Sequence, residues 1–154
     1  MRPRMGWIVA ALFGILLVTT PPKPVEAKPK SRVEWVRVDV GDRPDSAKLA
    51  KVFKQILEKA ARKANFGDAK DIRLTARLTE LRSEQRGDVL HVHCAVAGRV
   101  AGGEGARSKM AFGGSPERKE DLEKEVLTMV ANGLVARLAQ IVRTHPSPNT
   151  RAAR

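Results

Sequence analysis

Cysteine, histidine and aromatic residues are scarce in this sequence of 154 residues. The chain has one Cys, three His, two Trp, four Phe and no Tyr. A single thiol excludes an intramolecular disulfide framework. One thiol and three imidazoles also leave few ligands for a zinc site and few partners for a nucleophilic triad. Because aromatic side chains are so few, base stacking on a nucleic acid is poorly supported.

Basic residues are abundant by contrast. The chain carries 29 Lys and Arg against 17 Asp and Glu, which gives a formal net charge of +12 at pH 7. Hydrophobic residues make up 42% and charged residues 30%, a globular rather than a disordered composition. The length suits one domain. A strongly basic domain favours anionic surfaces or acidic proteins as partners.

Residues 1–27 match a secretory signal peptide. Two arginines precede an uninterrupted apolar run at 8–18, which is shorter than the roughly 20 apolar residues of a spanning helix. Val25 and Ala27 supply small residues for cleavage after Ala27. The alternative is an uncleaved amino-terminal anchor. Cleavage predicts an exported protein, periplasmic or associated with the outer membrane, with no stable transmembrane segment after processing. In that compartment no nucleic-acid partner is expected.

Hydropathy patterns divide the rest of the chain into six elements between a basic linker at 28–32 and a disordered tail at 144–154. Period-two alternation indicates strands, and apolar residues at helical spacing indicate two amphipathic helices. Asp45 or Ser46 is expected to cap the first helix, and Ser115 followed by Pro116 to start the second. The expected elements are strand 33–40, helix 46–64, strands 71–81, 89–100 and 107–112, and helix 116–143.

This order, β-α-β-β-β-α, predicts an α+β fold in a single domain at 33–143. Two amphipathic helices need an apolar sheet face on which to bury their stripes. We therefore expect a two-layer sandwich with both helices packed on one face of a four-stranded, mainly antiparallel sheet. Strict alternation directs Val36, Val38 and Val40 to the helices in the first strand, and Met110 and Phe112 in the last.

The uncovered sheet face is then expected to be basic. Arginine is a forked donor suited to carboxylate and phosphate, and an exposed tryptophan can anchor a partner contact. A solvated, functionless face is the alternative, and the first helix carries a second basic surface (Lys48, Lys51, Lys54, Lys59, Arg62 and Lys63). The candidate binding residues on the sheet face are Trp35, Arg37, Arg73, Arg77, His91, His93, Arg107 and Lys109.

Other motifs are interpreted as structural. His91 and His93 have the spacing of a metal pair on one strand face, but neighbouring arginines disfavour a dication, so no metal site is predicted. Cys94 alternates inward with Val92 and Val96 and is expected to be a buried thiol; an intermolecular disulfide is the alternative. The glycines at 102–105 lack the rest of a phosphate-binding loop. We predict no catalytic residue and no cofactor.

The pattern resembles the small exported α/β domains of the TolB amino-terminal and CsgG-like type. The resembling segments are VEWVRVDV, the helix DSAKLAKVFKQIL, the hairpin IRLTARLTEL–VLHVHCAVAG and the helix LEKEVLTMVANGLVARLAQIV, between residues 33 and 143. The resemblance implies a non-catalytic part of a bacterial envelope assembly. TolB-like domains usually continue into a propeller, and CsgG-like pore proteins carry a lipid-attachment Cys. Neither feature is found here, so no functional residue is carried over.

These observations favour a non-enzymatic periplasmic binding or assembly module that docks an envelope protein through its basic sheet face. The first alternative is an electrostatic binder of anionic envelope polymer or lipid, whose binding is expected to fall steeply with added salt. The second alternative is an enzyme, which requires a cleft with converging titratable groups. The oligomeric state is not predicted.

Overall fold

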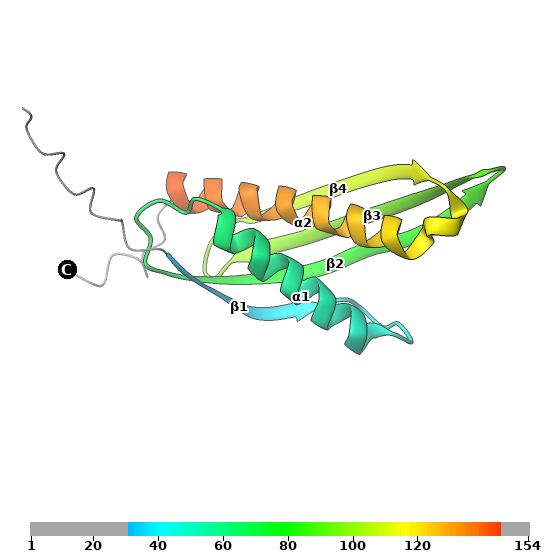
Figure 1. Cartoon of the computed structure of the whole chain (residues 1–154). Helices are drawn as coiled ribbons and strands as arrows, with labels where there is room; N and C mark the ends of the chain where they lie inside the picture. The colour runs from blue at the N-terminus through cyan, green and yellow to red at the C-terminus, as the bar shows by residue number, and fades with distance from the viewer. Residues whose placement is uncertain (1–30, 146–154) are drawn as a thin grey trace, which may run out of the picture.

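The structure is a computed structural model that describes residues 31–145. The predicted signal peptide and all but the first two residues of the predicted tail lie outside the described residues. The elements follow the order β-α-β-β-β-α, with one short 3₁₀ turn before the last helix (Figure 1). They are β1 (Arg32–Asp39), α1 (Ser46–Lys63), β2 (Asp71–Arg86), β3 (Val89–Val100), β4 (Gly105–Gly114), η1 (Pro116–Arg118) and α2 (Lys119–Thr144).

The four strands form one sheet in the spatial order β1-β2-β3-β4. β1 and β2 are parallel because α1 carries the chain back across the sheet between them. The β2–β3 and β3–β4 pairs are antiparallel hairpins. Both helices lie on the same face of the sheet (Figure 1). The predicted fold class, element order and two-layer arrangement are therefore confirmed.

The core lies between this sheet face and the helices. α1 buries Phe53 and Leu57 from its predicted stripe. α2 buries a wider stripe than predicted, because it packs against the sheet on one side and against α1 on the other. The segment Pro116–Thr144 is long and apolar enough to cross a membrane by length and composition alone, yet half of its apolar window is buried in this core. Its buried side chains include Leu122, Val126, Leu127, Val130, Leu134, Val135, Leu138 and Val142.

A β-bulge in β1 overturns the predicted alternation of that strand. Trp35 pairs with Leu74 and Arg37 pairs with Thr75, so Val36 is an extra residue without a partner on β2. The bulge therefore exchanges the sheet faces to which Trp35 and Val36 were expected to point. Trp35 points into the core and is 8% exposed, whereas Val36 is 48% exposed. The predictions that Val36 is buried and that Trp35 shares the open face with Arg37 are both wrong.

The β2–β3 hairpin is longer than predicted. β2 continues to Arg86, and only Gly87 and Asp88 form the connection, with Gly87 at a φ of +59°. This positive φ is a conformation that glycine adopts without steric cost. The extra length carries the hairpin beyond the helices at one end of the molecule (Figure 1).

Two further predictions need correction. Neither Asp45 nor Ser115 makes a side-chain capping hydrogen bond, although both stand at the N-cap position of α1 and η1 respectively. Met110 and Phe112 lie on the helix side of the sheet, opposite Cys94 and Val92, but they are not buried: Met110 is 39% and Phe112 46% exposed. β4 is an edge strand, so its side chains have core neighbours on one side only.

Candidate functional site

The face of the sheet turned away from the helices is uncovered along the part of the chain that the structure describes. Basic side chains from all four strands stand on it, as predicted. The strand register brings the arginines of β1, β2 and β4 together toward the β3–β4 turn and separates them from the histidines, which lie toward the β2–β3 turn. The predicted residues found on this face are Arg37, Arg73, Arg77, His91, His93, Arg107 and Lys109.

Four arginines surround a hollow of about 700 Å³ on this open face. The register sets Ala97 between an arginine of β2 and an arginine of β4, and Thr75 between an arginine of β1 and an arginine of β3. The small side chains of Thr75 and Ala97 thus form a floor from which long guanidinium groups rise. We call this feature the arginine groove, after Arg37, Arg77, Arg99 and Arg107.

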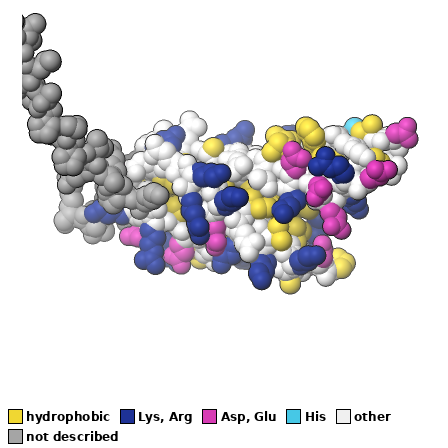
Figure 2. Space-filling view, viewed as in Figure 1, with side chains coloured by type: hydrophobic (Ala, Val, Ile, Leu, Met, Phe, Trp, Pro, Cys, Tyr) yellow, Lys and Arg dark blue, Asp and Glu magenta, His cyan; other side chains and the backbone are white. Residues whose placement is uncertain are grey.

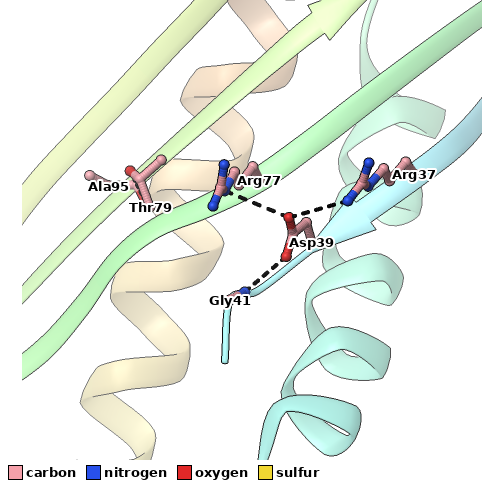
Figure 3. A network of polar contacts seen from close by, with 6 residues as sticks. All are labelled: Arg37, Asp39, Gly41, Arg77, Thr79 and Ala95. Atoms are coloured by element: carbon pink, nitrogen blue, oxygen red, sulfur yellow. Dashed lines mark hydrogen bonds and ion pairs between the residues drawn. The ribbon is translucent and has the colours of Figure 1, made fainter. Parts of the chain in front are cut away.

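One carboxylate, that of Asp39, stands at the β1 end of the groove (Figure 3). Its Oδ2 lies 3.6 Å from Nε of Arg77 and 3.8 Å from Nη2 of Arg37. Its Oδ1 accepts a hydrogen bond of 2.9 Å from the Gly41 N–H. That backbone bond is the main cause that lowers the pKa of Asp39 below its usual 3.8, and the two arginines lower it further. Asp39 is therefore ionised at neutral pH.

The ion pairs of Asp39 with Arg37 and Arg77 are weak. Both arginine side chains are largely exposed, and exposed pairs of this length add little to stability because solvent screens them. Asp39 thus holds Arg37 and Arg77 over the groove without neutralising it. Arg99 and Arg107 take part in no ion pair among the described residues. The groove therefore has an excess of positive charge and donors that face solvent.

Removing the Asp39 carboxylate is expected to strengthen anion binding in the groove. In Asp39→Asn, Arg37 and Arg77 lose their internal competitor, so sulfate affinity at neutral pH should rise about twofold to fivefold, as expected for exposed ion pairs. In the wild-type protein, acidification through the lowered pKa of Asp39 should have the same effect, because protonation neutralises the same group. Calorimetric sulfate titrations of both proteins check this; equal affinities at neutral pH would contradict it.

The same pKa shift sets the sign of a stability effect. A carboxyl group with a lowered folded pKa stabilises the protein above its unfolded pKa, and this contribution disappears as the pH falls through the folded value. The stabilising contribution of ionised Asp39 is therefore present at neutral pH. It is lost as the pH falls below 3.8, the usual pKa of an aspartate, and through the lower pKa that Asp39 has in the folded protein.

The structure does not bring the predicted histidines to the arginine groove. His93 pairs with Arg82 and His91 with Glu84, further along the sheet toward the β2–β3 turn. Charge there is balanced, since Arg86 forms an ion pair with Glu84 at 3.1 Å and Arg82 one with Glu80 at 2.8 Å. No group of three potential metal ligands occurs among residues 31–145.

Trp35 is not part of the open face. It lies between β1 and α1 beside Lys54, Glu58 and Arg62. Its indole Nε1 is buried and has no hydrogen-bond partner among the described residues. The bulge at Val36 therefore moves the candidate anchor from the docking face to the core side of the sheet.

Sequence reasoning missed one groove residue, Arg99. It lies on β3 in the same alternation as His91 and His93, so continuing that alternation to the end of the strand would have placed it on the open face. Gly98, its neighbour, faces the helices instead, where a Cβ atom would meet Leu134 and the Thr75 carbonyl at 3.0 Å. A side chain at position 98 would therefore push α2 away from the sheet.

Cys94 is buried as predicted, with 1% exposure. Burial raises the pKa of its thiol to about 11, and the nearby Arg43 only partly offsets this. Since the thiolate is the reactive form, we expect a thiol reagent at neutral pH to leave the native protein unmodified and to label one thiol after unfolding in denaturant. A colorimetric thiol assay checks this; rapid labelling of the native protein would contradict it.

No protein-family model and no curated protein sequence matches this chain. Among solved structures, a Caulobacter crescentus CB15 protein provisionally called a lipoprotein is 11% identical, with a TM-score of 0.43 over 70% of this chain and 88% of that one. A minor lipoprotein from Acinetobacter baumannii is 11% identical, with a TM-score of 0.35 over 71% of this chain and 94% of that one. The Protein Y N-terminal domain from Thermus thermophilus is 12% identical, with a TM-score of 0.35 over 72% and 98%. At these identities and TM-scores the likenesses carry no argument about function.

Proposed function

We propose that this protein is a non-enzymatic binding module of the bacterial cell envelope and that it docks an acidic protein partner through the open face of its sheet. The observation that carries the proposal is the arginine groove. Four guanidinium groups from four strands converge on a floor of small side chains, and one carboxylate accompanies them. The proposed location in the envelope is supported by the signal peptide that the sequence predicts.

The chemistry of the groove favours carboxylates as ligands. A guanidinium is a planar fork that donates two parallel hydrogen bonds to one carboxylate. Asp39 stands at one end of the groove, where one of its oxygens forms long ion pairs with Arg77 and Arg37. A partner carboxylate beside Ala97 would reach Arg107, which has no acidic partner among residues 31–145. We therefore assign the partner an exposed acidic segment.

The face is also suited in shape to a protein segment. A strand or loop lying along the sheet would fill the hollow of about 700 Å³ with its backbone and small side chains. Thr75 and Ala97 alternate with the arginines across the strands, and their small side chains leave the hollow open between the guanidinium groups. Shape and charge thus select an extended acidic segment over an isolated ion.

A second candidate function is binding to anionic envelope polymer or lipid. The helix side of the protein favours it, since Lys and Arg are distributed over that surface as well (Figure 2). A charged surface that binds a polyanion from any side needs no groove. Such binding depends on long-range attraction, which salt screens within about 8 Å at physiological ionic strength.

A cross-linked pull-down from an envelope extract, at low and high salt, separates the two functions. The proposal expects one discrete protein retained at moderate salt by the wild-type protein and lost by Arg77→Glu/Arg107→Glu. Capture of lipid or wall material alone, released by salt, would support the second candidate. Equal capture by the wild-type protein and the variant would rule out the arginine groove as the docking surface.

A further inference from the structure

The outer edge of β4 has a defined set of backbone groups that face away from the sheet. The Val100 N–H donates to the Glu104 carbonyl across the β3–β4 turn at 3.1 Å. The pairing then runs without a register shift to Leu90 and Gly114. Antiparallel pairs alternate between bonded and non-bonded positions. The even-numbered residues of β4 therefore bond to β3, and the odd-numbered residues direct their N–H and C=O groups outward.

One end of this edge is already covered. Nη1 of Arg137, on α2, donates a hydrogen bond of 2.6 Å to the carbonyl of Arg107. The outward groups of Lys109, Ala111 and Gly113 take part in no hydrogen bond among residues 31–145. The free edge is thus a short run centred on Ala111.

Exposed apolar side chains accompany the free edge. Met110 and Phe112 flank Ala111 on the helix side of the sheet and are 39% and 46% exposed. Figure 2 shows apolar surface beside α2 where that helix lies against β4. An unpaired edge with apolar side chains next to it is a template for another strand.

We propose that β4 pairs with β4 of a second copy of this chain, antiparallel and about a two-fold axis at Ala111. In this register Ala111 exchanges hydrogen bonds with its counterpart, and Lys109 does so with Gly113 of the second copy. Met110 then lies opposite Phe112 of the second copy, and the same pair recurs on the other side of the axis. The free edge is self-complementary because its donors, acceptors and apolar side chains are arranged evenly about one residue.

The charges also agree with this register. Lys109 faces a glycine, so no two cations stand opposite each other within the paired run. Arg107, with Arg137 beside it, comes next to Ser115 of the second copy and approaches its Glu117. Glu117 is exposed and forms no ion pair among the described residues. Each end of the interface therefore brings two guanidinium groups toward an unpaired carboxylate.

The other edge of the sheet is less suited to a second copy. β1 is shorter and contains the bulge at Val36, which breaks the regular spacing of backbone groups. Bulges of this kind twist an edge away from further pairing. A two-fold β4 contact also closes on itself with two copies, whereas a β1-to-β4 contact would leave a free edge on each added copy and would build a ring or an open filament. The predicted assembly is a dimer with two arginine grooves on one continuous sheet face.

Light scattering and sedimentation of the purified protein test this proposal first. We expect a dimer that dissociates on dilution. Ala111→Pro should weaken it at least tenfold, because proline removes an N–H that points away from β3 and leaves the β3–β4 hydrogen bonds intact. A wild-type protein that stays monomeric up to its solubility limit would overturn the proposal, as would a folded proline variant that dimerises equally well.

A cross-link gives the register independently of the proline variant. In a Cys94→Ala background, Ala111→Cys should form an intermolecular disulfide, since bonded antiparallel pairs have Cα atoms about 5.5 Å apart and disulfides span about 4.4–6.8 Å. The control is Ala136→Cys, exposed on α2 on the side toward α1. Rapid oxidation at 111 alone supports the proposal; equal or no oxidation at the two positions contradicts it.

Discussion

Replacing Arg77 and Arg107 by glutamate should abolish docking of the envelope partner and leave the fold intact. Each arginine contributes a charge-assisted hydrogen bond to a partner carboxylate, worth about 1.5–3 kcal/mol. Removing two such bonds lowers affinity at least about a hundredfold, and the new carboxylates add repulsion. Both side chains stand on the open face, and neither contributes to the buried core. Surface-immobilised partner, once identified, measures the loss directly.

The matched control is Lys48→Glu/Lys51→Glu on the exposed face of α1. It makes the same change in net charge at the other side of the molecule. If docking depends on the arginine groove, this control binds almost as well as the wild-type protein. If both double variants lose binding equally, total charge rather than the groove governs the interaction, and the second candidate function is favoured.

Leu134→Ala should be among the most destabilising single substitutions in the chain. Leu134 is fully buried, and its Cδ2 lies within 3.0 Å of the position where a Gly98 Cβ would stand. Truncating a buried leucine removes apolar contact and leaves a cavity, at a cost of about 2–5 kcal/mol. Domains of this size are stable by only about 5–15 kcal/mol, so the urea midpoint should fall sharply.

The control for this substitution is Gln140→Ala, exposed on the same helix. Exposed substitutions usually change the free energy of unfolding by less than about 0.5 kcal/mol. Urea unfolding followed by circular dichroism compares the two variants. A Leu134→Ala midpoint equal to that of Gln140→Ala would mean that α2 does not pack on β3 as described.

The sequence was sufficient to predict the layers because the periodicities are strong. The stripe of α1, which includes Phe53 and Leu57, matches helical spacing throughout, and β2 alternates from Ile72 to Leu78 without exception. Patterns of this kind reflect burial on one face, which is also what determines the fold. Alternation along β3 predicts the burial of Cys94 in the same way, and the structure confirms it.

Alternation failed where the backbone gains one residue. Val33, Trp35 and Val38 all point toward the helices, although they do not share one parity. Only the extra residue at Val36 reconciles them, and hydropathy does not locate a bulge within a strand as apolar as β1. The exposure of Phe112 was missed for a different reason. Edge position depends on strand order, which pairing in three dimensions decides.

The sequence predicts the basic face that holds the arginine groove, but not the groove itself. Arg37, Arg77 and Arg107 were assigned to one face, but their convergence depends on register, since a shift of two residues would separate them along the sheet. The histidines show this separation, because their strand positions place them beside Arg82 and Glu84 instead. A face can be predicted from alternation alone, whereas a site on that face requires the pairing of the strands.

A photo-cross-linking residue at Arg73, which is exposed on the open face beside the arginine groove, tests the central claim most directly and leaves the floor of the groove unchanged. The same residue at Lys48, on α1, is the matched control. Irradiation in intact cells should give one discrete protein adduct from position 73 and none from position 48. Adducts from position 48 alone, or none from position 73, would contradict docking through the open sheet face.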